Sequence, residues 1–379
     1  MWRVCANRDR KPDFFVLLYL HIPFCHRVCP YCSFYKHTPG GTELRGFIDA
    51  LAAEAQNRLA ESAVPPRTLY LGGGTPSLLS PRHLTRLFSA LHQTIDFSML
   101  EEVTLEANPA TFDAAKARLF RESGVTRVSL GIQSFNPHVL ETLGREHTVT
   151  QATESVAILR NAGIPQVNID LMFSVPGQSA ADWEFSLRKA MELEPDHLSA
   201  YNLTYEEDTE FLESLRRGEV AIHEDIDARF FQLADQILTS HGFDHYETSN
   251  YARPGRCSTH NLGYWRGEDY LGLGPSAVST LDSVRSKNVA DTTSYISQVQ
   301  ALGHALADSE TLDPEAVRLE RIALGLRTTE GIPIELLDPA ALARAKVFVQ
   351  ENLAHIENGR LILIHRGRAL VDPIVSELI

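Results

Sequence analysis

Residues 19–32 read Tyr-Leu-His-Ile-Pro-Phe-Cys-His-Arg-Val-Cys-Pro-Tyr-Cys and bring Cys25, Cys29 and Cys32 together on one short loop. The chain has only five cysteines in 379 residues, so this clustering is a strong signal. Thiolates spaced in this way bind zinc, copper(I) or an iron–sulfur cluster. Structural zinc needs four protein ligands, and the next cysteine, Cys257, is far away in the sequence. Three ligands would leave one iron of a four-iron cluster open, which suits a reactive site.

Size, charge and hydropathy limit the class of protein. A chain of 379 residues with 44% apolar and 22% charged residues is typical of a globular protein with one large domain and a smaller one. The net charge of −14 argues against a nucleic-acid partner, because phosphate binding needs basic surfaces. No run of 18 apolar residues is present, so we expect no membrane span.

The cysteines also indicate a compartment. The apolar run Val16–Leu20 is too short for a signal peptide and leads into the cysteine loop. Clustered cysteines without a secretory signal predict a reducing, cytoplasmic location. Cys5 and Cys257 are expected to be ordinary thiols outside any site.

Short β-rich runs alternate six times with longer amphipathic stretches. Strands are predicted over Val16–Ile22, Thr68–Leu71, Glu102–Glu106, Arg127–Ile132, Val167–Phe173 and His197–Leu203. Helices are predicted near Glu43–Glu61, Pro81–Ile95, Phe112–Glu122, Thr150–Ala162, Ala180–Leu193 and Ile226–His241. This alternation predicts an α/β fold with parallel strands and right-handed crossovers. Six units suit a three-quarter (β/α)6 barrel or a doubly wound sheet.

Polar and glycine residues gather where these strands end. The cysteine loop follows the first strand and Gly72–Thr75 follows the second; Glu106, Gln133, Asp170 and Tyr201 lie in or at the ends of the next four. Ligands of parallel α/β proteins bind at the carboxyl ends of the strands. We therefore expect one site at this rim.

The pattern changes after about residue 245. Residues 245–270 show no clear period and are expected to be an ordered loop. Helices from about Asp313, a hairpin with its turn at Asn358 and Gly359, and a last helix over Gly367–Leu378 predict a small winged-helix-like unit. We divide the chain into a core at 14–245, a connecting segment at 246–305 and a C-terminal domain at 306–379.

The cysteine spacing, with an aromatic residue before the last cysteine, resembles the radical S-adenosylmethionine superfamily. One branch of it, the oxygen-independent coproporphyrinogen III oxidases and HemW-type haem chaperones, is similar over nearly the whole chain. The matching motifs are Tyr19-x-His-Ile-Pro-Phe-Cys, Gly72-Gly-Gly-Thr-Pro-Ser, Glu106-Ala-Asn-Pro, Gly131-Ile-Gln-Ser-Phe, Asn168-Ile-Asp-Leu and His260-Asn-Leu-Gly-Tyr-Trp.

Three features favour the chaperones within this branch. The oxidases carry a further cysteine where this chain has Phe34, and they have a longer extension before the residue equivalent to Tyr19. The chaperones carry His-Asn-x-x-Tyr-Trp, present here as His260, Asn261, Tyr264 and Trp265. The chain departs from the family pattern at Ser174, where the family usually has a glycine. The difference bears on the local backbone shape, because serine adopts a positive φ less easily than glycine.

The resemblance implies roles for single residues. Cys25, Cys29 and Cys32 would each bind one iron of a [4Fe–4S] cluster, whose fourth iron would take the amino and carboxylate groups of S-adenosylmethionine. For this S-adenosylmethionine the implied binding residues are Tyr19, Tyr31 on the adenine, Gly73 at the methionine end and Glu106. Six further residues correspond to those that hold a second S-adenosylmethionine in the oxidases: Gly74, Thr75, Gln133, Arg145, Asp170 and Thr204. Asp170 needs a partner inside an apolar strand, and Arg145 is the expected one.

His260 is the candidate axial ligand of haem, since neutral imidazole is the common choice. Tyr264 and Trp265 would cover the macrocycle edge, with Asn261 in the same motif. A hydrogen-bonded structural histidine is the alternative.

The resemblance thus implies a haem chaperone that passes haem to acceptor proteins, with membrane respiratory complexes as candidates and a homodimer as one possible state. The alternatives are oxidative decarboxylation of coproporphyrinogen III, which we expect to be absent, and radical chemistry on an unrelated substrate.

Overall fold

The computed structural model describes residues 15–62, 64–364 and 366–379. Cys5 and residue 14, where the predicted core begins, lie outside the described residues. A large sheet runs in the order β12-β11-β10-β9-β1-β2-β3-β4-β5-β6-β8-β7. Its centre is six parallel strands: β1 (Val16–Ile22), β2 (Pro66–Gly73), β3 (Glu102–Ala107), β4 (Arg127–Gln133), β5 (Gln166–Phe173) and β6 (His197–Asn202). All six predicted strands are confirmed.

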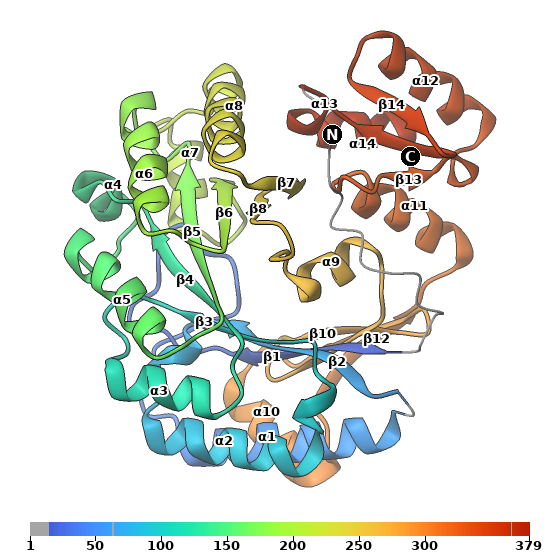
Figure 1. Cartoon of the computed structure of the whole chain (residues 1–379). Coiled ribbons are helices and arrows are strands. Elements are labelled where there is room, and N and C mark those ends of the chain that lie inside the picture. The colour runs from blue at the N-terminus through green and yellow to red at the C-terminus, as the bar shows by residue number, and fades with distance from the viewer. Residues whose placement is uncertain (1–14, 63, 365) are drawn as a thin grey trace.

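Helices cover the outer face of the curved sheet (Figure 1). They are α1 (Leu44–Glu61), α2 (Pro81–Thr94), α3 (Ala114–Glu122), α5 (Val149–Asn161), α6 (Ala180–Glu192) and α8 (Glu224–Ser240). The short helices α4 (Pro137–Thr142) and α7 (Glu210–Arg216) belong instead to a small separate apolar cluster that includes Tyr31 of the cysteine loop. Four of the covering helices have an N-cap side chain that accepts a hydrogen bond from a backbone N–H of the first turn, which favours the start of the helix there. These N-cap residues are Ser80, Asp113, Thr148 and Ser179. The predicted partial barrel is confirmed as an open α/β sheet.

Side-chain alternation gives this sheet two different faces. Leu18 and Leu20 of β1 are fully buried and pack in the main core under the helices. Their neighbour Tyr19 faces the inner side, where its ring lies 6.0 Å from that of Tyr70 on β2. The same alternation along the other strands directs apolar residues toward the helices on the outer face and hydroxyl or carboxyl residues toward the cavity on the inner face.

The ends of the sheet differ from expectation. Residues 245–270 are not a loop: they form β7 (Asp244–Glu247), β8 (Asn250–Ala252) and α9 (Thr259–Trp265), elements too short to show a period. Sequence reasoning also missed β9 (Tyr270–Leu273), which is parallel to β1, and the antiparallel β10 (Val278–Leu281), β11 (Val284–Asn288) and β12 (Leu306–Thr311). The helix α10 (Thr292–Leu302) connects β11 to β12.

A second core forms the C-terminal unit. It packs α11 (Pro314–Gly325), α12 (Pro339–Gln350), α13 (Arg366–Ala369) and α14 (Val371–Leu378) around a sheet of β13 (Ile332–Pro333), β15 (Arg360–Leu363) and β14 (Ala354–Glu357). The predicted hairpin is confirmed, whereas the expected last helix is divided at Leu370. Because β12 pairs with β11 in the large sheet, a boundary at residue 306 would cut off a strand of the first unit.

Ser174 adopts a left-handed backbone conformation, which glycine adopts more easily than serine. Its φ is +60°, and its Oγ is buried with no hydrogen-bond partner among the described residues. An L-residue in this region costs about 1–2 kcal/mol. The serine is therefore tolerated at a cost in stability.

We predict that Ser174→Gly stabilises the protein by about 1 kcal/mol, because it relieves the strain at positive φ. Gly177→Ala is the matched control: φ is +80° there and an added Cβ meets nothing within 4 Å, so only the backbone strain changes. Thermal unfolding should show a higher midpoint for Ser174→Gly and a lower one for Gly177→Ala. A lower midpoint for Ser174→Gly would contradict the account.

Candidate functional site

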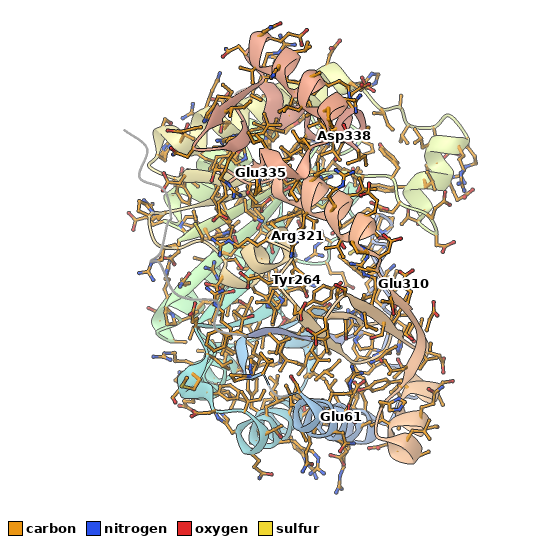
Figure 2. The ribbon with its side chains drawn as sticks, turned by 90° about the vertical axis from the view of Figure 1, so that its right-hand side faces the viewer. Glu61, Tyr264, Glu310, Arg321, Glu335 and Asp338 are labelled. Atoms are coloured by element: carbon orange, nitrogen blue, oxygen red, sulfur yellow. The ribbon has the colours of Figure 1, made fainter. Side chains whose placement is uncertain are left out.

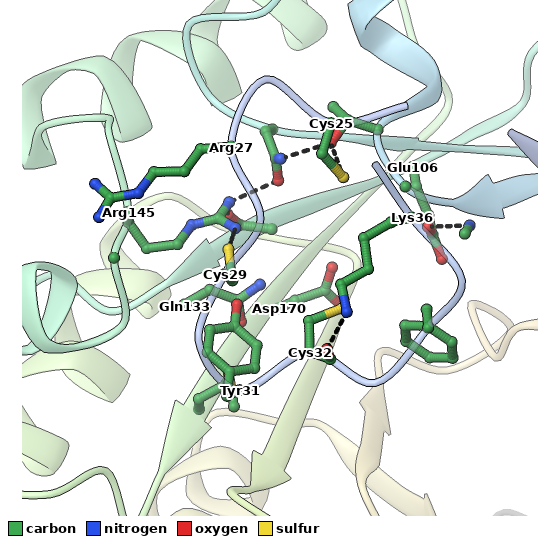
Figure 3. Close-up of a pocket in the computed structure, with 18 of the residues that line it drawn as sticks. Cys25, Arg27, Cys29, Tyr31, Cys32, Lys36, Glu106, Gln133, Arg145 and Asp170 are labelled. Carbon is green, nitrogen blue, oxygen red and sulfur yellow. Dashed lines mark hydrogen bonds between the residues drawn. The ribbon is translucent and has the colours of Figure 1, made fainter. Parts of the chain in front are cut away.

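A cavity of about 460 Å³ opens at the carboxyl ends of the parallel strands (Figure 3). This volume is in the range of small-molecule sites. Most of the predicted site residues line it: Cys25, Cys29, Tyr31, Cys32, Gly73, Gly74, Thr75, Glu106, Gln133, Arg145, Asp170 and Thr204. Tyr19, His260, Asn261, Tyr264 and Trp265 are not part of this lining.

The cysteine loop is closed at its base by backbone hydrogen bonds. The amide of Cys25 donates to His37 O (3.0 Å), and the amide of His37 donates to Pro23 O (2.9 Å). Phe24 anchors the loop in the core with only 1% exposure, while Gly74 N and Thr75 N donate to the carbonyls on either side of Pro23. The loop is thus fixed to the strand ends while its thiols face the cavity.

The three thiols are spread around the cavity. Among residues 15–62, 64–364 and 366–379, no three His, Cys, Asp or Glu side chains converge on one metal-ion position. Burial raises the pKa of Cys25 and Cys32, while Thr75 and Lys36 respectively oppose that rise.

A continuous chain of hydrogen bonds joins two of the cysteines. Arg145 Nη1 donates to Cys29 Sγ (3.6 Å), and Arg145 Nη2 donates to Asn108 Oδ1 (2.6 Å). Asn108 Nδ2 donates to Thr75 Oγ1 (3.0 Å), whose hydroxyl donates to Cys25 Sγ (3.6 Å). Hydrogen bonds to ligating sulfurs help to set the reduction potential of a cluster.

The expected ion pair between Asp170 and Arg145 is not formed. Asp170 accepts hydrogen bonds from Ser129 Oγ (3.0 Å) and Asn168 Nδ2 (2.7 Å), while Arg145 is held by Asn108 and by Gly131 O (2.7 Å). The carboxylate is satisfied by neutral donors on its own and the neighbouring strand. Burial raises the pKa of Asp170, and these hydrogen bonds partly offset the shift.

Glu106 lies at the end of β3 with both oxygens engaged. Tyr70 OH donates to its Oε1 (2.8 Å) and Gly73 N donates to its Oε2 (3.1 Å). Desolvation raises the pKa of Glu106 to about 7, against the hydrogen bond from Tyr70. The carboxyl group is therefore close to half protonated at neutral pH when no cation faces it.

Gly73 and Gly74 lie where there is no room for a side chain. Gly73 has a φ of +102°, and a Cβ there would lie 2.4 Å from the ring of His21. A Cβ on Gly74 would lie 2.8 Å from the carbonyls of Ile22 and Phe24. Close packing against the cysteine loop explains these glycines, and it leaves Gly73 N pointing at Glu106.

Two predicted cavity residues have contacts of their own. The ring of Tyr31, predicted to pack on adenine, lies 6.3 Å from that of Phe211 in α7. Thr204 Oγ1 donates to Glu206 (2.9 Å) on the rim. Neither contact removes the residue from the cavity lining.

The motif over residues 260–265 lies elsewhere, in α9 on the inner side of the sheet (Figure 1). His260 is only 1% exposed and burial lowers its pKa to about 4, so it is neutral. The backbone amide of Asn261 donates to Ser258 Oγ, which caps the helix. Tyr264 packs edge-on against His260 (4.9 Å), and Trp265 hydrogen-bonds to Glu247. These placements give no geometric support to the predicted haem contact.

The cavity fits the cofactors that the resemblance implies. S-adenosylmethionine carries a sulfonium, an ammonium and a carboxylate, and the lining offers the carboxyls of Glu106 and Asp170 and the guanidinium of Arg145. Gln133 Oε1 and Arg145 Nε are buried without a hydrogen-bond partner among the described residues, so both are available to a polar ligand.

Comparison with known proteins decides the family. A sequence profile of the Radical SAM superfamily matches residues 19–190. The haem chaperone HemW of Lactococcus lactis is 34% identical over 351 residues, which cover 92% of this chain and 91% of that protein. HemW of Mycobacterium tuberculosis is 36% identical over 367 residues, covering 96% and 94%. The chain belongs to the HemW family of the radical S-adenosylmethionine superfamily. A solved structure of coproporphyrinogen III oxidase (HemN) from Escherichia coli has the same fold, with a TM-score of 0.82 at 23% identity over 97% of this chain and 91% of that chain.

Sequence reasoning missed contacts that matter in this HemW family member. Asn108 stood inside the Glu-Ala-Asn-Pro motif, but only the structure places it between Arg145 and Thr75. Tyr70 was not singled out either. Its position between Leu69 and Leu71, which are buried under the helices, could have placed its side chain on the inner face of the sheet, because side chains alternate along a strand.

We predict that Glu106→Gln makes the apoprotein relatively more stable as the pH rises from 5 to 8. The folded-state pKa of about 7 lies above the ordinary value of 4.5, so wild type loses stability as the pH rises through this window. The 2.5-unit difference sets a ceiling of about 3 kcal/mol on the gain at pH 8.

Thermal unfolding of both proteins at several pH values measures this difference. Exposed Glu154→Gln is the control and should give parallel curves. A constant difference between wild type and Glu106→Gln over the same window would refute the assignment.

Proposed function

We propose that this protein is a haem chaperone that binds haem and delivers it to acceptor proteins, with a [4Fe–4S] cluster and S-adenosylmethionine in the cavity. The observation that carries the proposal is the thiol-lined cavity in a chain that is 34–36% identical to proteins named HemW. Phe34, at the position where the oxidases have a further cysteine, supports the chaperone branch.

In the proposed site, Cys25, Cys29 and Cys32 hold the cluster, which when reduced supplies an electron to S-adenosylmethionine. Glu106 and Gly73 bind and orient the methionine end of the cofactor, because a carboxylate and an amide lie side by side there. The Asn108–Arg145 chain fixes the sulfurs from outside.

The wider context is also proposed. The protein would work in the cytoplasm, because cysteines that bind a metal cluster must stay reduced, and that compartment keeps thiols reduced. Acceptors would include respiratory haemoproteins at the membrane. No helix in the described part of the chain is long and apolar enough to cross a membrane. We also propose the partition into core, connecting segment and C-terminal domain, with the last boundary placed after β12 rather than at residue 306.

The function is tested on anaerobically reconstituted protein with two assays. We predict that titrated haem gives a saturable Soret band with about one haem per chain, and that haem-loaded protein restores a haem-depleted acceptor enzyme. We also predict no conversion of coproporphyrinogen III to protoporphyrinogen IX. Turnover of coproporphyrinogen III, or the absence of any haem binding, would refute the chaperone assignment.

We predict that Cys29→Ser removes most of the iron and sulfide that wild type takes up, because a serine does not replace a ligating thiolate. Cys257→Ser is the matched control, since Cys257 does not line the cavity, and its iron content should equal that of wild type. Iron analysis and the visible absorption spectrum measure both. Equal loss in the two variants would show that the effect is not specific to the loop.

A further inference from the structure

The helix α9 is fixed to the inner face of the sheet by a buried carboxylate. Glu102, at the start of β3, is 3% exposed and is paired with Arg127 (Oε2 to Nε, 3.0 Å). The same carboxylate accepts hydrogen bonds from Ser258 Oγ (3.1 Å) and from the backbone amides of Thr259 (3.0 Å) and His260 (3.3 Å). Because breaking such a buried network is costly, the first turn of α9 has a defined place.

The ring of His260 is held from two sides. Its Nδ1 shares a hydrogen bond with Thr68 Oγ1 (2.7 Å). One face stacks on Tyr70 at a centroid distance of 4.8 Å and an interplanar angle of 28°, and Tyr264 meets it edge-on. Figure 2 shows Tyr264 between the sheet and Arg321 of α11, so the C-terminal unit backs this packing.

Tyr70 carries the contact on to the cavity. Its hydroxyl donates to Glu106 Oε1 (2.8 Å), while Gly73 N holds the other oxygen. Glu106, Gly73 and Tyr70 all line the cavity, whereas His260 does not. An unbroken series of contacts thus runs from α9 through the two stacked rings to the carboxylate at the candidate cofactor site.

We propose that His260 is a positioning residue for the S-adenosylmethionine site: its ring supports Tyr70, which orients the Glu106 carboxylate toward the cofactor. This inference rests on the proposed function, in which S-adenosylmethionine occupies the cavity. The stacked imidazole restricts the orientations open to the Tyr70 ring, because offset-stacked aromatic pairs are favourable beyond their area burial.

The same geometry opposes a role for His260 as a haem ligand. Its Nε2 is buried and has no partner among the described residues, and haem iron could reach it only if α9 left the sheet. Such a departure would break the Glu102 network and leave buried charges uncompensated.

The test uses reconstituted, cluster-loaded protein and measures S-adenosylmethionine affinity by anaerobic calorimetry, haem affinity by Soret titration, and the melting temperature. His260→Ala is expected to weaken S-adenosylmethionine binding about tenfold and to leave haem affinity unchanged. His260→Phe, which keeps a ring on Tyr70, is expected to stay within about twofold of wild type.

Tyr70→Phe removes the hydroxyl that orients Glu106 and is expected to weaken S-adenosylmethionine binding about as much as His260→Ala. The double variant should be no weaker than either single one, because both act through the same carboxylate. Additive losses would overturn the proposal.

Arg266→Ala is the control for general loosening of α9, since it breaks only ion pairs to Glu330 and Glu268 at the other end of the helix. It should leave S-adenosylmethionine affinity unchanged. An equal loss in Arg266→Ala, or an equal loss in His260→Phe and His260→Ala, would overturn the positioning role. Loss of the Soret band in His260→Ala with S-adenosylmethionine affinity intact would identify a haem ligand instead.

Thr68→Val decides the question if His260→Ala does not fold, because it removes only the bond that fixes the ring. It is expected to weaken S-adenosylmethionine binding about threefold, and an unchanged affinity would contradict the proposal. Failure of wild type to bind S-adenosylmethionine would instead refute the proposed site itself.

Discussion

Polar side chains on the inner face of a parallel sheet must find partners, because they are removed from water. In this protein Glu106 is held by Tyr70 and Gly73, and Asp170 by Ser129 and Asn168. These contacts keep carboxyl groups in place at a cavity where burial alone would oppose their charge. The geometry of the site depends on this condition, since these partners come from three strands of the sheet, β2, β4 and β5.

The shape of the cavity rim is set by close packing between the Gly74–Thr75 segment and the segment before Cys25. Gly74 and Thr75 donate backbone hydrogen bonds to the segment before Cys25, and any side chain on the glycine would separate the two loops. The cysteine loop is therefore anchored at its base, while Arg145 and Thr75 contact two of its sulfurs. A cavity prepared in this way needs little rearrangement to accept a cluster, which limits the entropy lost on binding.

Local patterns were sufficient for much of the fold. The six parallel strands have strong apolar runs, and the cavity residues sit at their ends, so sequence alone located both. The strands β9 to β12 escaped notice because they are short and β12 is exposed throughout. The partner of Asp170 was also predicted wrongly: Arg145 was expected, yet Ser129 on the neighbouring strand and Asn168, two residues away, supply the hydrogen bonds. His260 was predicted to contact haem because neutral imidazole is the common axial ligand, and its burial against Tyr70 can be recognised only once α9 is placed.

The central claim is that three thiols on one loop hold a four-iron cluster with an open iron that faces S-adenosylmethionine. Electron paramagnetic resonance of the dithionite-reduced, reconstituted protein tests it most directly. The account predicts a signal of a reduced [4Fe–4S] cluster whose g-values shift when S-adenosylmethionine is added, because the cofactor binds the open iron. A spectrum that stays identical on addition of the cofactor, or no cluster signal in protein that retains bound zinc, would contradict the account.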